Sequence, residues 1–247
     1  MAVRRVLENS GQAVQAEFSD GNVNDIFLPL LRRLTALRRE KGRRVAALLA
    51  APPGAGKSTL AALLQALSRE TPGLEPLTAL GMDGFHRRQA YLVSHTTLRG
   101  GESIPMSRVK GAPETFDLEA LQGALARVAA GEDCPWPAYD RTLHDPVEGA
   151  LRVTGEIALI EGNYLLLDAP GWRELRQYAD YTVFITADPE RLRGRLTARH
   201  LSTGKRPEIA AAMVASDMEN ARLCLEKSAP ADVTLRLMDD DTFILEE

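Results

Sequence analysis

A nine-residue segment between an apolar run and a helical pattern constrains this 247-residue chain most strongly. Residues 51–59 read Ala-Pro-Pro-Gly-Ala-Gly-Lys-Ser-Thr. They fit the phosphate-binding pattern G-x-x-x-x-G-K-[ST] except at Ala51, which we expect to close the preceding strand. Residues 45–50 before the segment are typical of a strand buried on both faces, and 57–70 predict a helix. A chance Gly-Pro turn is the alternative, but strand, loop, Lys-Ser pair and helix all coincide.

Each residue type in this segment has a physical reason. Gly54 and Gly56 allow backbone N–H groups to turn inward toward a phosphate, and the helix adds its positive end. Lys57 can reach the β- and γ-phosphates, and the Ser58 hydroxyl can ligate Mg²⁺. The segment therefore predicts a nucleoside triphosphate site, whose expected binding residues are Pro53, Gly54, Ala55, Gly56, Lys57, Ser58 and Thr59.

Apolar runs alternate with helical patterns along the rest of the chain. Further strands are expected at 77–82, 157–160, 181–186 and 232–237, and helices at 25–40, 118–130, 189–200 and 208–227. Asp188 before Pro189 is a typical helix start, with Asp as the N-cap. This alternation predicts an α/β fold of the P-loop NTPase type, a doubly wound parallel sheet flanked by helices.

The chain length suits a single domain over 1–247. Residues 3–7 and 12–18 alternate in β fashion around 8–11, which predicts an N-terminal β-hairpin. We expect residues 1–24 to form an appendage that carries this hairpin, and residues 25–247 to form the core.

Two carboxylates follow expected strands. Asp83 comes after 77–82 and Glu161 after 157–160, so both should reach the carboxyl edge of the sheet, where ligands bind. Asp83 could accept the proton of an incoming hydroxyl, and Glu161 could hold Mg²⁺ directly or through water. Each has a structural alternative, because Asp-Gly is a common turn and a Glu after a strand can be a turn acid.

Several other nucleotide-binding classes fit less well. The chain contains no Asn-Lys pair, so it lacks the N-K-x-D guanine reader of GTPases. A hydrolytic ATPase usually ends the corresponding strand in Asp or Asp-Glu, whereas here a lone Glu161 follows it. A net charge of −4 and 5% aromatic residues argue against a nucleic-acid-directed ATPase, which needs a basic track with interleaved aromatics.

Four further motifs lie in consistent order. They are Met-Asp-Gly-Phe-His at 82–86, Lys-Gly-Ala-Pro-Glu-Thr-Phe-Asp at 110–117, Pro-Ala-Tyr-Asp-Arg at 137–141 and Ile-Glu-Gly-Asn-Tyr at 160–164. With the phosphate-binding segment, the set resembles the phosphoribulokinase/uridine kinase/bacterial pantothenate kinase group of P-loop kinases, from about residue 25 to 232. Within this group it is most similar to the pantothenate-kinase-like nucleoside/nucleotide kinase proteins, some labelled fructose-transport-system kinases.

The resemblance implies an enzyme that uses ATP and Mg²⁺ to phosphorylate a hydroxyl of a small acceptor: a nucleoside, a pantothenate-like acid or a sugar. Asp83 matches the catalytic acid of the group and Glu161 its metal-side Glu-Gly, so Ser58 and Glu161 become the metal residues. For His144 a surface loop histidine is the alternative. The acceptor residues implied are Asp83, His86, Lys110, Tyr139, Arg141, His144, Glu161 and Asn220.

Arg191, Arg195 and Arg199 recur every four residues and so share a helix face. Positively charged lids neutralise charge on a transferred phosphoryl group. We therefore expect a helical lid over about 190–207, with Arg195 and Arg199 as catalytic residues beside Lys57 and Asp83. A solvated arginine-rich helix is the alternative.

A different function class, an ATP-binding regulator without a phosphorylated acceptor, remains the second hypothesis. The chain has two distant cysteines, no apolar window of 18 residues and too short an apolar start for a signal peptide. We expect a cytoplasmic protein whose partner is a small-molecule acceptor, with no nucleic acid and no membrane. Homodimer formation is left open.

Overall fold

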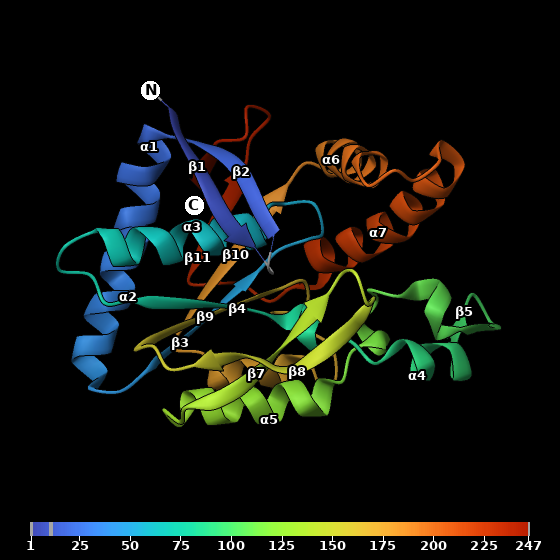
Figure 1. Ribbon diagram of the computed structural model, residues 1–247, viewed down its shortest axis with the longest axis horizontal. Coiled ribbons are helices and arrows are strands. Elements are labelled where there is room, and N and C mark those ends of the chain that lie inside the picture. The colour runs from blue at the N-terminus through green and yellow to red at the C-terminus, as the bar shows by residue number, and fades with distance from the viewer. Residues whose placement is uncertain (1, 10–11, 247) are drawn as a thin grey trace.

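The computed structural model describes residues 2–9 and 12–246. At its centre lies a six-stranded sheet in the order β12-β11-β10-β3-β9-β4 (Figure 1). Its pairs are parallel except β11 with β12. The predicted α/β fold is confirmed, with one antiparallel strand at the sheet edge. The strands are β3 Val45–Ala50, β4 Leu77–Gly81, β9 Ile157–Gly162, β10 Tyr181–Ala187, β11 Val233–Leu237 and β12 Phe243–Glu246.

Strand β3 is buried along its whole length because both faces of the sheet are covered. Val45, Ala47 and Leu49 belong to one apolar cluster, and the alternate residues of the strand belong to the other. The first cluster includes α2 (Leu28–Lys41) and α3 (Lys57–Glu70), and the second includes α5 (Leu118–Ala129). In Figure 1, α3 and α5 lie on opposite sides of the sheet.

The predicted N-terminal hairpin is confirmed as β1 (Ala2–Asn9) paired antiparallel with β2 (Gln12–Ser19). Residues 10 and 11 of its expected turn lie outside the described residues. Phe18 packs edge-on against Phe27, and Phe27 against Phe243, with ring centroids 6.0 and 5.8 Å apart. The Asn22 side chain exchanges two hydrogen bonds of 2.7 Å with the backbone of Phe243. These contacts join the start of the chain to strand β12.

One boundary prediction was wrong, and one strand was not predicted. The helix expected at 25–40 begins five residues earlier, because α1 (Asp20–Asn22), a π-helical turn (Val23–Phe27) and α2 run on without a break. The Ser19 hydroxyl accepts a hydrogen bond from the Asn22 N–H and caps this start. The strand expected at 232–237 is confirmed as β11, and it is followed by a further strand, β12, for which no prediction was made.

The remaining elements stand around the carboxyl edge of the sheet. Helix α6 (Pro189–Ser202) begins at the predicted Asp188 cap, whose carboxylate accepts from the N–H of Glu190, and it packs against α7 (Pro207–Lys227). No helix in the described part of the chain is long and apolar enough to cross a membrane. The other α-helix is α4 Gln89–Ser94, and the other strands are β5 Thr96–Arg99, β6 Glu102–Pro105, β7 Cys134–Asp140 and β8 Asp145–Val153.

Candidate active site

The loop between β3 and α3 has the backbone geometry of a phosphate cradle. Gly54 and Gly56 have φ angles of 86° and 84°, a left-handed conformation that favours glycine. Ala51 is buried and donates its N–H to the Gly162 carbonyl at 3.3 Å, so it closes the strand as expected. Gly56 is the N-cap of α3 and has no side chain to cover the first N–H groups of that helix. Those donors are therefore suited to an anion.

The parallel register brings the two predicted carboxylates to one edge of the sheet. Gly81 of β4 pairs with Glu161 of β9, and Asp83 follows in the 3₁₀ turn Met82–Phe85. A β-carbon at position 81 would lie 3.5 Å from the Glu161 Oε1 atom and 3.9 Å from the Asp83 nitrogen. Gly81 therefore lies directly beside the Glu161 carboxylate and the start of the turn that carries Asp83.

Burial raises the pKa of Glu161 above its ordinary value, since the residue is only 9% exposed. The Lys57 ammonium and a hydrogen bond with the Ser58 side chain oppose this shift, whereas the Asp83 charge adds to it. These groups therefore lie within electrostatic reach of one another. The structure brings together Lys57, Ser58, Asp83 and Glu161, as predicted.

Replacing Glu161 with Gln should raise the free energy of unfolding of the ligand-free protein at pH 7 by about 0.5–2 kcal/mol. The charged carboxylate is penalised in the folded state, so stability is lost as pH rises from the unfolded pKa through the raised folded pKa. Below about pH 4 the acid is protonated in both states, and the difference should vanish. Urea unfolding between pH 4 and 8 measures this.

The exposed Glu119, on the first turn of α5, provides the control, because Glu119→Gln should change stability little. Equal stability of wild type and Glu161→Gln at pH 7 would show that the buried charge is not penalised.

The residues at this edge fit a Mg²⁺ ion that is shared with a nucleotide. In residues 2–9 and 12–246, no group of three or more His, Cys, Asp or Glu side chains could hold a metal ion by itself. Mg²⁺ usually keeps several waters and takes one or two carboxylates together with substrate phosphates. The Ser58 hydroxyl and the Glu161 carboxylate provide such oxygen ligands beside the phosphate loop.

Three of the predicted acceptor residues, His86, Lys110 and Tyr139, form a packed group near Asp83. The His86 ring lies 4.0 Å from the Phe116 ring and 5.2 Å from the Tyr139 ring, measured between centroids. Desolvation lowers the pKa of His86, and the positive charges of Lys110 and Arg141 lower it further, against the pull of Asp83. His86 is therefore neutral at physiological pH and sits between the acid and the basic side chains.

Lys110 is held at this group by two hydrogen bonds. Its ammonium donates to the Gln89 side-chain oxygen at 2.9 Å and to the His144 carbonyl at 2.8 Å. It also lies 5.2 Å from the centre of the Tyr139 ring. Lys110 therefore contacts the backbone carbonyl of His144, not its imidazole. The His144 side chain is exposed on the β7–β8 turn, where the backbone φ of this residue is 55°.

Two positioning residues escaped the sequence reading. Asp145 accepts a hydrogen bond of 2.6 Å from the Gln89 N–H, and the Gln89 side chain in turn binds Lys110. Asp145 follows directly after His144, so its place in that motif was the available signal. Gln89 starts a short helix and carried no local signal.

Asn220 comes to the site from α7. It is 6% exposed, and a β-carbon on Gly111 would lie 3.7 Å from its Nδ2 atom. The Tyr164 hydroxyl donates to the Gly111 carbonyl at 2.7 Å, so the segment after Lys110 is fixed between Asn220 and the end of β9. Asn220 therefore lies beside the same segment as Lys110.

The three arginines of α6 divide between different partners. Arg195 donates to the Gly54 carbonyl at 2.7 Å and pairs with Asp241. Arg191 also pairs with Asp241, at 2.7 Å, whereas Arg199 pairs with Asp217 of α7 at 3.2 Å. Arg195 is thus the member of the trio that contacts the phosphate loop.

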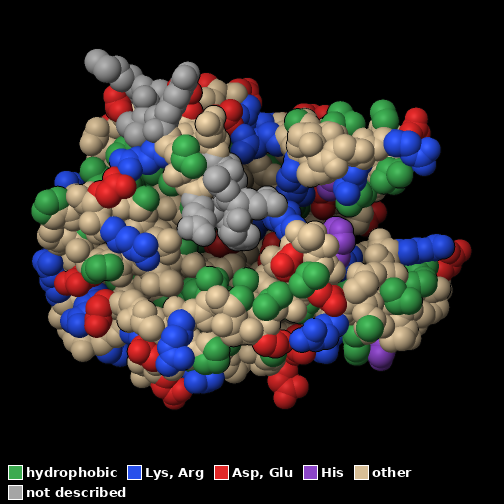
Figure 2. All heavy atoms as spheres, viewed as in Figure 1, with side chains coloured by type: hydrophobic (Ala, Val, Ile, Leu, Met, Phe, Trp, Pro, Cys, Tyr) green, Lys and Arg blue, Asp and Glu red, His purple; other side chains and the backbone are tan. Residues whose placement is uncertain are grey.

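The space around these groups is open to solvent. Figure 2 shows a cleft between the α6–α7 arm and the part that carries α4 and β5, with basic and histidine side chains gathered at its inner end. A cavity of about 690 Å³ lies on the other side of α6, next to Arg195. Its wall opposite the helix is formed by residues 236–239 at the end of β11. This cavity is connected to the phosphate loop through Arg195, which lines the cavity and donates to the Gly54 carbonyl.

Comparison with known proteins gives similarity over nearly the whole chain. No protein-family model matches it. Escherichia coli YggC, an uncharacterised protein, is 37% identical over 239 residues, covering 96% of this chain and 97% of YggC. A Schizosaccharomyces pombe protein named "putative uridine kinase" is 31% identical over 166 residues, covering 66% of this chain and 68% of that protein. The crystal structure of a "putative fructose transport system kinase" from Silicibacter sp. TM1040 has a TM-score of 0.69 at 35% identity, covering 81% and 98%.

Proposed function

Because the chain belongs to the phosphoribulokinase/uridine kinase/pantothenate kinase group of P-loop kinases, we propose that it transfers the γ-phosphate of ATP to a hydroxyl of a small acceptor. The observation that carries the proposal is the meeting of Lys57, Ser58, Asp83 and Glu161 beside the open N-terminus of α3. A phosphate cradle next to a free carboxylate is what phosphoryl transfer to a hydroxyl requires.

The roles follow from position. The loop glycines and the first turn of α3 hold the phosphates, while Lys57 and Arg195 offset the negative charge that spreads over the transferred group. Mg²⁺, when bound through Ser58 and Glu161, would neutralise phosphate charge and orient the γ-phosphate. Asp83 takes the proton from the acceptor hydroxyl as the new O–P bond forms and the bond from the γ-phosphorus to the bridging oxygen breaks, with ADP as the leaving group.

The base of ATP has a suitable place in the 690 Å³ cavity beside α6. The cavity adjoins Arg195, which binds the Gly54 carbonyl of the phosphate loop. A nucleotide with its phosphates on the loop would therefore have its base close to α6 and the end of β11.

The acceptor occupies the opposite side of the phosphate loop in this proposal. His86, Lys110 and Tyr139 contact one another there, with Arg141 and Asn220 near them. A neutral imidazole, an ammonium, a phenol and an amide suit a polar acceptor with several hydroxyl or carbonyl groups. Nucleosides, pantothenate-like acids and sugars all have this chemistry.

A screen of ADP release tests the function. The whole chain with Mg²⁺ and ATP is offered nucleosides, vitamins and sugars in turn, and one class should raise ADP release at least tenfold above the rate without acceptor. Thermal shift measurements with ATP and with each compound report binding independently. ATP binding without stimulated turnover by any compound would instead support the regulator hypothesis. The presence of Asp83 and Glu161 disfavours that hypothesis, because a regulator needs no proton acceptor at the γ-phosphate.

A further inference from the structure

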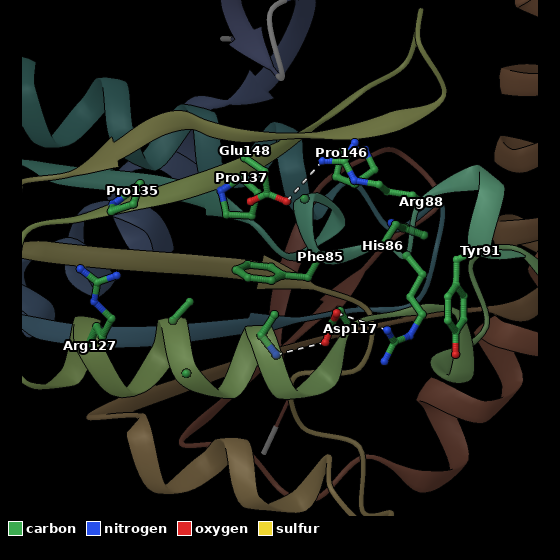
Figure 3. A pocket seen from close by; sticks show the side chains of 15 residues that line it. Phe85, His86, Arg88, Tyr91, Asp117, Arg127, Pro135, Pro137, Pro146 and Glu148 are labelled. Carbon is green, nitrogen blue, oxygen red and sulfur yellow. Dashed lines mark hydrogen bonds and ion pairs between the residues drawn. The ribbon is translucent and has the colours of Figure 1, made fainter.

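A second cavity lies behind the turn that carries Asp83. Its volume is about 580 Å³, which is within the range of small-molecule sites. Residues 84–88 after Asp83, helix α5 and the β7–β8 hairpin line it, whereas Lys57, Asp83 and Glu161 do not. Figure 3 shows Phe85 in the middle, between α5 on one side and the hairpin on the other. The cavity is separate from the phosphate loop, but it shares one lining residue, His86, with the acceptor group.

The middle of the cavity is apolar and stiff. Pro135, Pro137 and Pro146 form the apolar part of its hairpin wall, and Phe85 lies in the middle. Proline rings and a buried phenyl group lose little conformational freedom when they bind a ligand. They offer flat apolar surfaces against which a ring can pack.

Each end of the cavity carries arginine, and two of these arginines are paired with acids: Arg87 with Asp117 at 3.3 Å and Arg127 with Glu132 at 3.0 Å. Arg87 and Arg88 lie at one end and Arg127 at the other, as Figure 3 shows for Arg88 and Arg127. Arg88 has only a distant partner, Glu148 at 3.8 Å, and both side chains are more than half exposed. Such an exposed pair contributes little, so an anionic ligand could take the place of Glu148 at small cost.

The cavity and Asp83 share one structural element, the 3₁₀ turn Met82–Phe85. Phe85 belongs to the same 3₁₀ turn and packs edge-on against Trp136 with a centroid distance of 4.9 Å. The Trp136 indole N–H donates to the Gly81 carbonyl at 2.9 Å, just before the turn. Gly84 lies so close to the Pro137 carbonyl that a β-carbon would be 2.1 Å from its oxygen. A ligand that contacts Phe85 would therefore contact a turn whose backbone is tightly packed, so that a shift of Phe85 would also move Asp83.

We propose that this cavity is a second ligand site, which binds a small organic anion with a flat apolar ring, and that its occupancy changes turnover at Asp83. The ring packs between Phe85 and the prolines, and the anionic group pairs with Arg88 in place of Glu148. The turn at 82–85 transmits the effect. The binding part of this inference stands without the proposed kinase activity, and the turnover part rests on it.

Phenyl phosphate is the probe, because it combines a ring with an anion. The chain has two tryptophans, so a Trp172→Phe background isolates the emission of Trp136, which contacts Phe85. Phenyl phosphate should change this emission saturably. The change should persist in Lys57→Met, which removes the phosphate-loop cation. Loss of the signal in Lys57→Met would place the probe on the phosphate loop and overturn the proposal.

Two variants address the cavity itself. Gly123 lines it from α5 with open space around its β-carbon position, so Gly123→Leu should fill the cavity without disturbing the helix. It should weaken probe binding by more than about tenfold, and Arg88→Gln should weaken it by about tenfold. Arg173→Gln, which removes an exposed arginine of a distant pair, is the matched control. Undiminished affinity in Gly123→Leu would rule out the site.

The effect on turnover is measured as ADP release with saturating phenyl phosphate. It should change at least twofold in wild type and stay constant in Gly123→Leu. Inorganic phosphate, which has no ring, should have no such effect. An equal change in wild type and Gly123→Leu, or no change in wild type, would overturn the coupling to Asp83. If the chain releases no ADP with any acceptor, the proposed function fails while the emission titration still decides the binding site.

Discussion

Replacing Asp83 with Asn should lower acceptor-dependent turnover by about 10²- to 10⁴-fold, the usual contribution of general-base catalysis. The amide has nearly the size of the carboxylate but cannot take a proton from the acceptor hydroxyl. Binding of ATP should change little, because the proposed role of Asp83 is toward the acceptor hydroxyl and the phosphates are held by the loop and Lys57. ADP release at saturating ATP and acceptor measures the loss, and isothermal titration with ATP measures binding separately.

The exposed Asp168, which pairs with Arg173 away from the site, offers a matched control. Asp168→Asn should keep wild-type turnover. Full acceptor-dependent turnover by Asp83→Asn would show that another group takes the proton, and the assignment of Asp83 would then be wrong.

Replacing Lys57 with Met should lower kcat/KM for ATP by about 10²- to 10³-fold, comparable to the loss of a group that stabilises charge in the transition state. Methionine keeps most of the length of the side chain and removes the ammonium, which lies in the first turn of α3. The pKa of Glu161 should also rise further, since the Lys57 charge opposes the effect of burial. Steady-state kinetics with varied ATP measures the loss.

Lys227, exposed in the last turn of α7, serves as control. Lys227→Met should retain full activity, so a decrease in Lys57→Met alone reports on the phosphate loop. If Lys57→Met turned over ATP at the wild-type rate, the loop would not hold the triphosphate as proposed.

The parts of the fold that follow local rules could be predicted from the sequence. Strand β3 and helix α3 lie at the predicted residues, because a continuous apolar run and a helix start after Gly56 are both local signals. Strand β7 escaped notice because Pro135 and Pro137 lie within it, and proline usually argues against a strand. It pairs with a single strand through an irregular register between Trp136 and Ala138, where those prolines are tolerated.

The site was predictable where sheet topology alone brings residues together. Asp83 and Glu161 follow neighbouring parallel strands, so the carboxyl-edge rule places them correctly. The arginines of α6 show the limit of such reasoning. Their spacing predicts a shared face, but the partners of Arg191 and Arg195 lie about 50 residues further along, at Asp241. Helical periodicity carries no information about a distant loop.

The link between Asn22 and Phe243 has a consequence for biosynthesis. The two residues are separated by 221 positions, so a chain growing on the ribosome makes Asn22 long before its hydrogen-bond partner exists. Until then the apolar side of Phe27, which packs on Phe243 in the folded protein, has no strand β12 to cover it. Nascent chains with such exposed surface are prone to aggregate. Emergence of strand β12, rather than emergence of the phosphate loop, therefore sets the moment at which this domain can close.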